Sequence, residues 1–202
     1  MILLFAALAL AAPPEGLRPG LSPWDAPEQF AQWMKSQGAA GASLACTDPW
    51  PEHAKLCFRL WEKEKRRYVT QADAATWGSD AAGLQAAVLE RSRGKIAGML
   101  ERTPVEGLPA HYWIARDGDG WQASGILHPD ELADAIGGVP ILVAAPADGV
   151  LLAWRPGVEG VDKAMAVGVR EMHDQLDGSI TPVIHRWDGT AWAVWGKAVA
   201  AE

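Results

Sequence analysis

The sequence predicts an α+β fold with a mostly antiparallel sheet built from hairpins, two long helices and two or three short helices packed on the sheet. Every second residue from Leu56 to Leu60 is large and apolar, which is the period of a strand with one buried face. Between Val158 and Leu176 apolar residues recur at spacings of three and four, which predicts an amphipathic helix. The predicted helices join hairpins instead of parallel strands, and this order favours α+β over a doubly wound fold.

The chain begins with an apolar stretch that is typical of an export signal. Residues 1–12 read MILLFAALALAA and are followed by two prolines. The stretch is too short to cross a bilayer, and small residues at Ala9 and Ala11 fit cleavage after Ala11. We therefore expect residues 1–11 to be a signal peptide. The mature chain is expected to be periplasmic or extracellular, without stable membrane insertion after cleavage.

Residues 12–41 are expected to form a proline-rich linker and one short helix. Four prolines and two glycines between residues 12 and 23 disfavour regular structure. Asp25 and Pro27 then suit the start of a helix that continues to about Gln37, with Phe30 and Trp33 on its apolar face. A single α+β domain is expected over residues 42–199.

Three antiparallel strands are predicted over residues 42–46, 55–61 and 66–70. Thr70 and Asp73 have the spacing of a capping box, so a short helix is expected to follow the third strand. Only two cysteines are present, Cys46 and Cys57, and they flank the turn between the first two strands. In an exported protein the expected state is a disulfide that stabilises this hairpin by about 3 kcal/mol, and the alternative is a pair of buried free thiols.

A long helix is predicted from Ser79 to about Arg102, with its apolar residues near one face. Glycines at positions 83, 94 and 98 weaken it, each by up to about 1 kcal/mol relative to alanine. A break near Gly94 is therefore one alternative. We expect packing against the sheet to hold most of the helix together.

The second half of the chain is predicted to contain three hairpins and two helices. The first hairpin joins strands at 110–116 and 121–126 through the turn at 117–120. A short helix is expected to run from residue 128 to the glycines at 137 and 138. The continuous apolar runs at 141–145 and 150–154 predict the central strands of the sheet. The helix at 158–176 and a closing hairpin, 183–187 with 192–195 around Asp188-Gly189, complete the prediction.

Several of these segments resemble the uncharacterised bacterial YtpQ-like family, a domain of unknown function. The similar segments within residues 56–195 are Tyr68-Val69-Thr70 with Trp77-Gly78, Trp121 to Leu127, Pro140 to Pro146 and His185 to Gly189. The resemblance implies a similar order of strands and helices. No established catalytic residues come with this family, so it implies nothing about mechanism. The predicted signal peptide and residues 12–45 depart from it.

Composition argues against several kinds of site. A formal net charge of −7 disfavours binding of nucleic acid through the overall field. Two cysteines without suitably spaced histidines do not form a zinc site, and the five histidines show no metal-binding pair. We therefore predict neither a metal site nor a cofactor.

Two classes of function stay open on the sequence. The leading hypothesis is a non-catalytic binding or accessory domain of the cell envelope that holds an unknown protein or envelope ligand on its sheet or on a tryptophan-bearing edge. Among eleven tryptophans, Trp192 and Trp195 lie on opposite sides of one predicted strand, so at least one is expected to be accessible. The alternative is an exported enzyme, for example a hydrolase, with a site around His173 and Asp174. A solvated helix end explains those two residues without catalysis.

Overall fold

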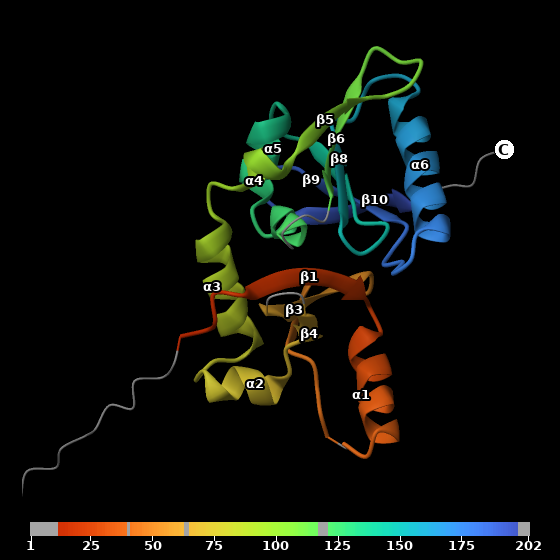
Figure 1. Cartoon of the computed structure of the whole chain (residues 1–202). Coiled ribbons are helices and arrows are strands. Elements are labelled where there is room, and N and C mark those ends of the chain that lie inside the picture. Colours follow the sequence, from red (N-terminus) through yellow and green to blue (C-terminus); the bar gives the residue numbers. More distant parts are fainter. Residues whose placement is uncertain (1–11, 40, 63–64, 117–120, 198–202) are drawn as a thin grey trace, which may run out of the picture.

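The computed structural model describes residues 12–39, 41–62, 65–116 and 121–197 (Figure 1). These residues form an α+β fold with two antiparallel sheets, as predicted for the fold class. The prediction of two long helices is only roughly matched. The two longest described helices have 15 and 12 residues, and a third is almost as long, with 11 residues. The predicted signal peptide at 1–11 and the predicted turn at 117–120 lie outside the described residues.

The smaller sheet is built around one long strand. Strand β3 (Ala54–Glu62) pairs with β1 (Leu17–Pro23) on one side and with β2 (Cys46–Trp50) and β4 (Lys65–Tyr68) along its other side. Strands β3 and β4 correspond to the second and third predicted strands, whereas β2 shares only Cys46 with the strand predicted at 42–46 and covers residues predicted as a turn. The strand β1 was not predicted.

The expectation that residues 12–23 form an irregular linker is wrong for residues 17–23. These residues pair antiparallel with β3 over their whole length, from Leu17 opposite Leu60 to Pro23 opposite Ala54. Strand β1 is at the edge of its sheet, where a proline that lacks an N–H costs little. Leu17 is fully buried, so hydrophobic burial against β3 outweighs the local preference of the prolines and glycines.

Three helices between β4 and the first strand of the larger sheet connect the two sheets. Thr70 forms the predicted capping box with Asp73: the Thr70 hydroxyl accepts from the Asp73 amide at 3.1 Å, and an Asp73 carboxylate oxygen accepts from the Thr70 amide at 2.9 Å. The long helix predicted to reach residue 102 is wrong, because it stops at Ser92 and Gly94 adopts a left-handed φ of 72°. Glycine adopts that conformation without a Cβ penalty, so the break falls there. The helices before the larger sheet are α1 (Ala26–Ser36), α2 (Gln71–Thr76), α3 (Ala81–Ser92) and α4 (Ile96–Met99).

The larger sheet has six strands in the order β10-β9-β7-β8-β6-β5. The two strands predicted to be central, β7 and β8, lie in the middle, and the closing hairpin predicted at Asp188-Gly189 is β9 with β10. The strands are β5 (Glu101–Pro104), β6 (His111–Arg116), β7 (Ile141–Ala144), β8 (Val150–Trp154), β9 (Val183–Trp187) and β10 (Trp192–Lys197).

The predicted strand at 121–126 is wrong. Residues Gln122–Ile126 form a buried 3-10 helix, η1, and β6 pairs with β5 and β8 instead. The run contains small residues, and a Cβ on Gly125 would lie 2.5 Å from the side chain of Leu151. Close packing of this compact turn against β8 therefore replaces strand pairing. The helix that follows, α5 (Pro129–Ile136), ends at Gly137 with a left-handed φ of 102°, at the predicted end of that helix.

The two faces of the larger sheet are covered differently. Helix α6 (Val161–Gln175) lies along one face in Figure 1, and its apolar residues pack on those of β7, β8 and β9. The other face shares a second buried cluster with the smaller sheet, α3, α5 and η1. The two sheets therefore share one hydrophobic core, with β1 between β3 and the larger sheet (Figure 1).

Candidate functional site

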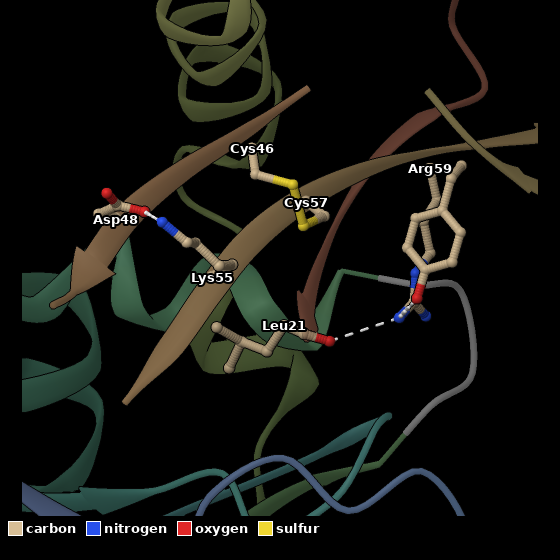
Figure 2. The surroundings of a disulfide bond; sticks show 7 residues. Leu21, Cys46, Asp48, Lys55, Cys57 and Arg59 are labelled. Atoms are coloured by element: carbon tan, nitrogen blue, oxygen red, sulfur yellow. Dashed lines mark hydrogen bonds and ion pairs between the residues drawn. A yellow bond between two sulfur atoms is a disulfide. The ribbon is translucent and has the colours of Figure 1, made fainter. Parts of the chain in front are cut away.

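The predicted disulfide is present between Cys46 and Cys57. The two residues lie directly opposite each other on β2 and β3, with their Cα atoms 4.1 Å apart (Figure 2). On the same strand pair, the ammonium of Lys55 lies 2.6 Å from a carboxylate oxygen of Asp48. The disulfide and the ion pair hold β2 against β3, which is the strand that carries Arg59.

Helix α1 differs from a typical surface helix because none of its eleven residues is buried. It nevertheless carries Phe30 and Trp33, and the Trp33 side chain is 56% exposed. A surface helix of a globular protein usually buries such an apolar face against the core. Only two residues separate α1 from the end of β1 at Pro23, so the helix is held beside the smaller sheet (Figure 1).

An apolar groove of about 470 Å³ lies between α1 and the smaller sheet. The ring of Phe30 lines it, with its centroid 5.9 Å from that of Trp33 and 6.2 Å from that of Tyr68. The groove therefore has an aromatic wall contributed by both the helix and β4. It is lined by Pro23, Ala26, Gln29, Phe30, Trp33, Leu44 and Tyr68, and we call it the α1 groove.

A second hollow of about 230 Å³ adjoins the α1 groove at Tyr68. Tyr68 lines both spaces, and the guanidinium of Arg59 lies 5.1 Å from the centroid of its ring. We call this space the arginine hollow. It is lined by Arg59, Arg66, Arg67, Tyr68 and Asp148.

Arg59 is fixed in the arginine hollow by residues from both halves of the chain. Its Nη1 donates to both carboxylate oxygens of Asp148, at 2.6 and 2.9 Å. Its Nη2 lies 3.4 Å from the Leu21 carbonyl oxygen of β1 (Figure 2). Burial by itself lowers the pKa of Arg59, but attraction and hydrogen bonding to Asp148 outweigh burial and raise this pKa. The guanidinium is therefore a permanent, rigidly placed cation.

The other two arginines of the hollow come from β4 and are exposed. The Nη1 atom of Arg67 lies 2.9 Å from a carboxylate oxygen of Asp73, and the Arg66 guanidinium lies 4.3 Å from the centroid of Trp61. Burial raises the pKa of Asp73, but hydrogen bonds from Thr70 and Arg67 lower it by more. Three guanidinium groups and one carboxylate, that of Asp148, therefore line the arginine hollow. Asp73 binds Arg67 but does not line the hollow.

The two tryptophans proposed from the sequence lie on β10 and are not among the residues that line the α1 groove. Trp192 is half-buried, and its ring lies 5.3 Å from that of Trp187 and 5.6 Å from that of Trp50. Trp195 is 42% exposed on this edge strand. Trp192 therefore contributes to packing between the sheets, while Trp195 presents an accessible indole.

The residues proposed for a hydrolase site lie at the end of α6. His173 Nδ1 is 3.0 Å from one carboxylate oxygen of Asp174, and the other carboxylate oxygen accepts from Arg170 Nε at 2.7 Å. These hydrogen bonds lower the pKa of Asp174. The nearby hydroxyl of Ser179 donates to the backbone carbonyl of His173 at 2.5 Å and not to its imidazole. This arrangement closes the helix end and brings no serine nucleophile to the imidazole.

A serine, a histidine and a glutamate with triad-like distances were missed in the sequence. His128 Nε2 is 2.9 Å from Ser92 Oγ, and its Nδ1 is 3.2 Å from a carboxylate oxygen of Glu131. Nε2 also lies 3.0 Å from the carbonyl oxygen of Leu89, so this ring nitrogen is shared between the serine and a backbone acceptor.

Ser92 itself is fully buried, and its hydroxyl donates to the carbonyl of Val88 at 2.8 Å. The second carboxylate oxygen of Glu131 accepts from the Gly94 amide at 2.9 Å. These bonds satisfy polar groups at the end of α3 and join that end to the start of α5. The role of the trio is therefore structural.

Over 12–39, 41–62, 65–116 and 121–197, no group of three or more histidine, cysteine, aspartate or glutamate side chains is arranged to hold a metal ion. No helix within these ranges has both the length and the apolar character needed to cross a membrane.

Comparisons with known proteins leave the site to be interpreted from its own geometry. No family model matches the sequence, and neither a curated protein nor a solved structure matches it. The sequence did indicate the apolar face of α1. It gave no signal that Tyr68 would adjoin that face, or that Arg59 would meet Asp148, which lies 89 residues further along the chain.

Proposed function

We propose that this chain is an exported, non-catalytic binding domain of the cell envelope that holds an apolar segment of a partner protein in the α1 groove. The observation that carries the proposal is a helix with no buried residue whose Phe30 and Trp33 border a groove of about 470 Å³. That volume lies in the range of about 300–1,000 Å³ that is typical of ligand sites.

The chemistry of the lining supports binding over catalysis. Among the described residues that line it, the polar side chains are the amide of Gln29 and the phenol of Tyr68, and none carries a carboxylate, imidazole, thiol or ammonium group. General acid-base and nucleophilic catalysis depend mainly on such groups near the reacting atoms. The groove is therefore better suited to retaining a ligand than to transforming it.

The same lining supports a peptide in preference to a free sugar. The hydroxyls of a sugar lose water on binding and need several hydrogen-bond partners in return. Two polar side chains do not supply them, whereas the rings of Phe30, Trp33 and Tyr68 offer a large surface to apolar side chains. A segment with two or three bulky apolar residues fits this chemistry.

The proposed location draws support from the disulfide. Disulfides persist in oxidising compartments outside the cytosol, and the Cys46–Cys57 bond fits such a compartment. The proposed relation to the YtpQ-like family brings no catalytic residue, so it is compatible with a binding role.

The test follows the indole N–H signals in a two-dimensional ¹⁵N NMR spectrum. The probe is a capped pentapeptide of leucine, phenylalanine, leucine and two asparagines. We expect the Trp33 signal to shift on titration while the Trp195 signal stays in place. The variant Trp33→Ala should weaken binding at least fivefold, and the matched control Trp195→Ala should not. Shifts confined to Trp195 and its neighbours on β10, or no saturable shift, would overturn the α1 groove as the site.

A further inference from the structure

We infer that the protein has a second ligand site, a groove between α6 and the larger sheet that binds a small amphiphile with an apolar tail and a cationic head group. The groove has a volume of about 340 Å³, within the range of about 300–1,000 Å³ that is typical of ligand sites. We call it the α6 groove. This inference goes beyond the proposed function, and its test does not depend on the α1 groove.

The α6 groove has the length of a short hydrocarbon chain. Three of its lining residues, Ala164, Gly168 and Met172, recur at every fourth position of α6. Residues with this spacing lie on one side of a helix, and eight residues span about 12 Å along its axis. Tyr112 of β6 and Leu152 of β8 line the groove from the sheet. An extended tail of several carbon atoms therefore fits between helix and sheet.

Gly168 keeps the middle of the groove open. It lies inside α6, whose helical backbone any residue can adopt. A Cβ added to it would meet no described atom within 4 Å. Neither the backbone conformation nor a close contact requires glycine here, although glycine is a poor helix former. A larger side chain would occupy part of the α6 groove, so glycine preserves the volume that a tail needs.

The side chains around Gly168 offer a surface that adapts to an apolar tail. Met165 and Met172 line the groove from α6, and Leu152 lines it from the sheet. The methionine side chain is unbranched, flexible and polarizable, so it packs against irregular or variable shapes. Two methionines therefore suit a flexible hydrocarbon tail better than they suit one rigid partner.

The charge of the lining selects the head group. Among the described residues that line the α6 groove, Glu106 is the only charged one, and it is exposed. The basic residues Lys163 and Arg170 of α6 do not line the groove. A carboxylate at the rim of an apolar groove attracts a cationic head group and repels an anionic one. The ring of Tyr112 adds a surface that also favours an ammonium group. The site therefore favours an amine over a fatty acid.

The position of Glu106 orients the ligand. The loop that carries it lies beside the start of α6, because a Cβ on Gly160 would lie 3.5 Å from the side chain of Leu108. Met172 lies near the other end of α6. The head group is therefore expected near Glu106, where it stays hydrated, and the tail extends along α6 toward Met172.

The experiment titrates the full chain with octylammonium and with nonanoate, which carry the same eight-carbon tail and opposite charges. Binding is followed by the methyl signals of ¹³C-labelled methionine in 0.05 M NaCl, where screening is weak. The chain contains five methionines. Met165 and Met172 line the α6 groove, whereas Met34 of α1 and Met99 of α4 do not. Single methionine-to-leucine variants assign the signals.

We expect octylammonium to shift the signals of Met165 and Met172 until saturation, while those of Met34 and Met99 stay in place. Octylammonium should bind about five- to tenfold more tightly than nonanoate, since attraction in one case and repulsion in the other each change the affinity a few-fold. Glu106→Gln should reduce this preference at least threefold.

Three further variants separate the groove from general effects. The matched control Glu101→Gln removes an exposed carboxylate of β5 that does not line the groove, and it should preserve the preference. Gly168→Leu should fill the groove and weaken both probes at least fivefold. Glu106→Lys should reverse the preference toward nonanoate, and this reversal cannot come from a folding defect.

Several outcomes would overturn the inference. Equal affinity for the two probes would reject a cation-selective site, and shifts at Met34 or Trp33 without shifts at Met165 and Met172 would reject the α6 groove. A preference that Glu101→Gln reduces as much as Glu106→Gln would come from the overall charge of −7 and not from the groove. Tighter binding of a capped leucine-lysine-leucine peptide at the same methionines would assign the groove to a protein segment. None of these results would test the α1 groove as a peptide site.

Discussion

The imidazole of His185 stacks on the indole of Trp50, with 4.1 Å between ring centroids and 9° between ring planes. His185 belongs to β9 and Trp50 to β2, so this pair joins the two sheets. His185 is 3% exposed, and neither ring nitrogen has a hydrogen-bond partner among the residues that the structure describes. Burial, followed by the nearby ring of His53, lowers the pKa of His185 from 6.5 to about 3.

This stack predicts that the protein loses stability in mild acid. Between pH 6.5 and 3 the unfolded chain binds a proton at His185, whereas the folded protein keeps this ring neutral. The free energy of unfolding therefore contains the full contribution of His185 above pH 6.5 and loses it progressively as the pH falls toward 3. The full loss is on the order of 5 kcal/mol. Urea unfolding at a series of pH values measures it.

A substitution isolates the contribution of this ring. His185→Phe keeps an aromatic ring against Trp50 and removes the titration, so the free energy of unfolding should vary less between pH 6.5 and 4. The parent protein, measured at the same pH values, is the reference for this slope. An unchanged slope in His185→Phe would show that other groups cause the acid sensitivity.

The ion pair between Arg59 and Asp148 predicts an interaction across the two sheets that supports the candidate site. Asp148→Asn leaves the Arg59 charge partly buried, and we expect it to lower the free energy of unfolding by about 1–3 kcal/mol. Arg59→Met removes that charge. The double variant should therefore lose less than the sum of the two single changes. Additive losses in urea unfolding would mean that the pair is not coupled.

The disulfide predicts a measurable loss on reduction. Cys46 and Cys57 are 11 residues apart in the sequence, and loop-closure entropy gives such a bond about 2–3 kcal/mol. We expect dithiothreitol to lower the urea midpoint of the parent protein and to leave the Cys46→Ala, Cys57→Ala double variant unaffected. Titratable thiols in protein purified without reductant would contradict this state of the cysteines.

Elements with a strong local pattern were predictable from the sequence. The apolar runs of β7 and β8 mark central strands, and the turn at Asp188-Gly189 defines the closing hairpin, because each signal lies within a few neighbouring residues. Strand β1 carries the opposite local signal, with prolines and glycines, and only its pairing with β3 makes it a strand. The 3-10 helix η1 likewise depends on packing against Leu151.

The candidate site was less predictable because it is assembled across distant parts of the chain. The apolar face of α1 was visible, but its exposure depends on where the short connection from β1 places the helix. The arginine hollow requires β3, β4 and the turn that carries Asp148 to meet. No local spacing encodes that meeting, so sequence patterns directed attention to Trp195 and His173 instead.

In the turn between β2 and β3, one position has a backbone conformation that favours glycine but is occupied by glutamate. Glu52 has a φ of 66°, and the turn is closed by the His53 amide, which donates to the Trp50 carbonyl at 3.1 Å. A side chain in this left-handed region costs about 1 kcal/mol. Glu52→Gly should therefore raise the free energy of unfolding by about 0.5–1 kcal/mol, whereas Glu52→Ala, which removes the same charge, should not. An equal gain in both variants would assign the effect to charge.

Helix α6 predicts a stabilising substitution at Gly168. A Cβ added there meets nothing within 4 Å, because Gly168 borders a hollow of about 340 Å³ between α6 and the larger sheet. Alanine is favoured over glycine in a helix interior, so Gly168→Ala should stabilise the protein by about 0.5–1 kcal/mol. The matched substitution Gly125→Ala should destabilise by about 1–3 kcal/mol, because its Cβ would lie 2.5 Å from the buried side chain of Leu151. If α6 and η1 pack as described, urea unfolding should show changes of opposite sign in the free energy of unfolding of the two variants. A loss of stability in Gly168→Ala would mean that α6 lies closer to the sheet.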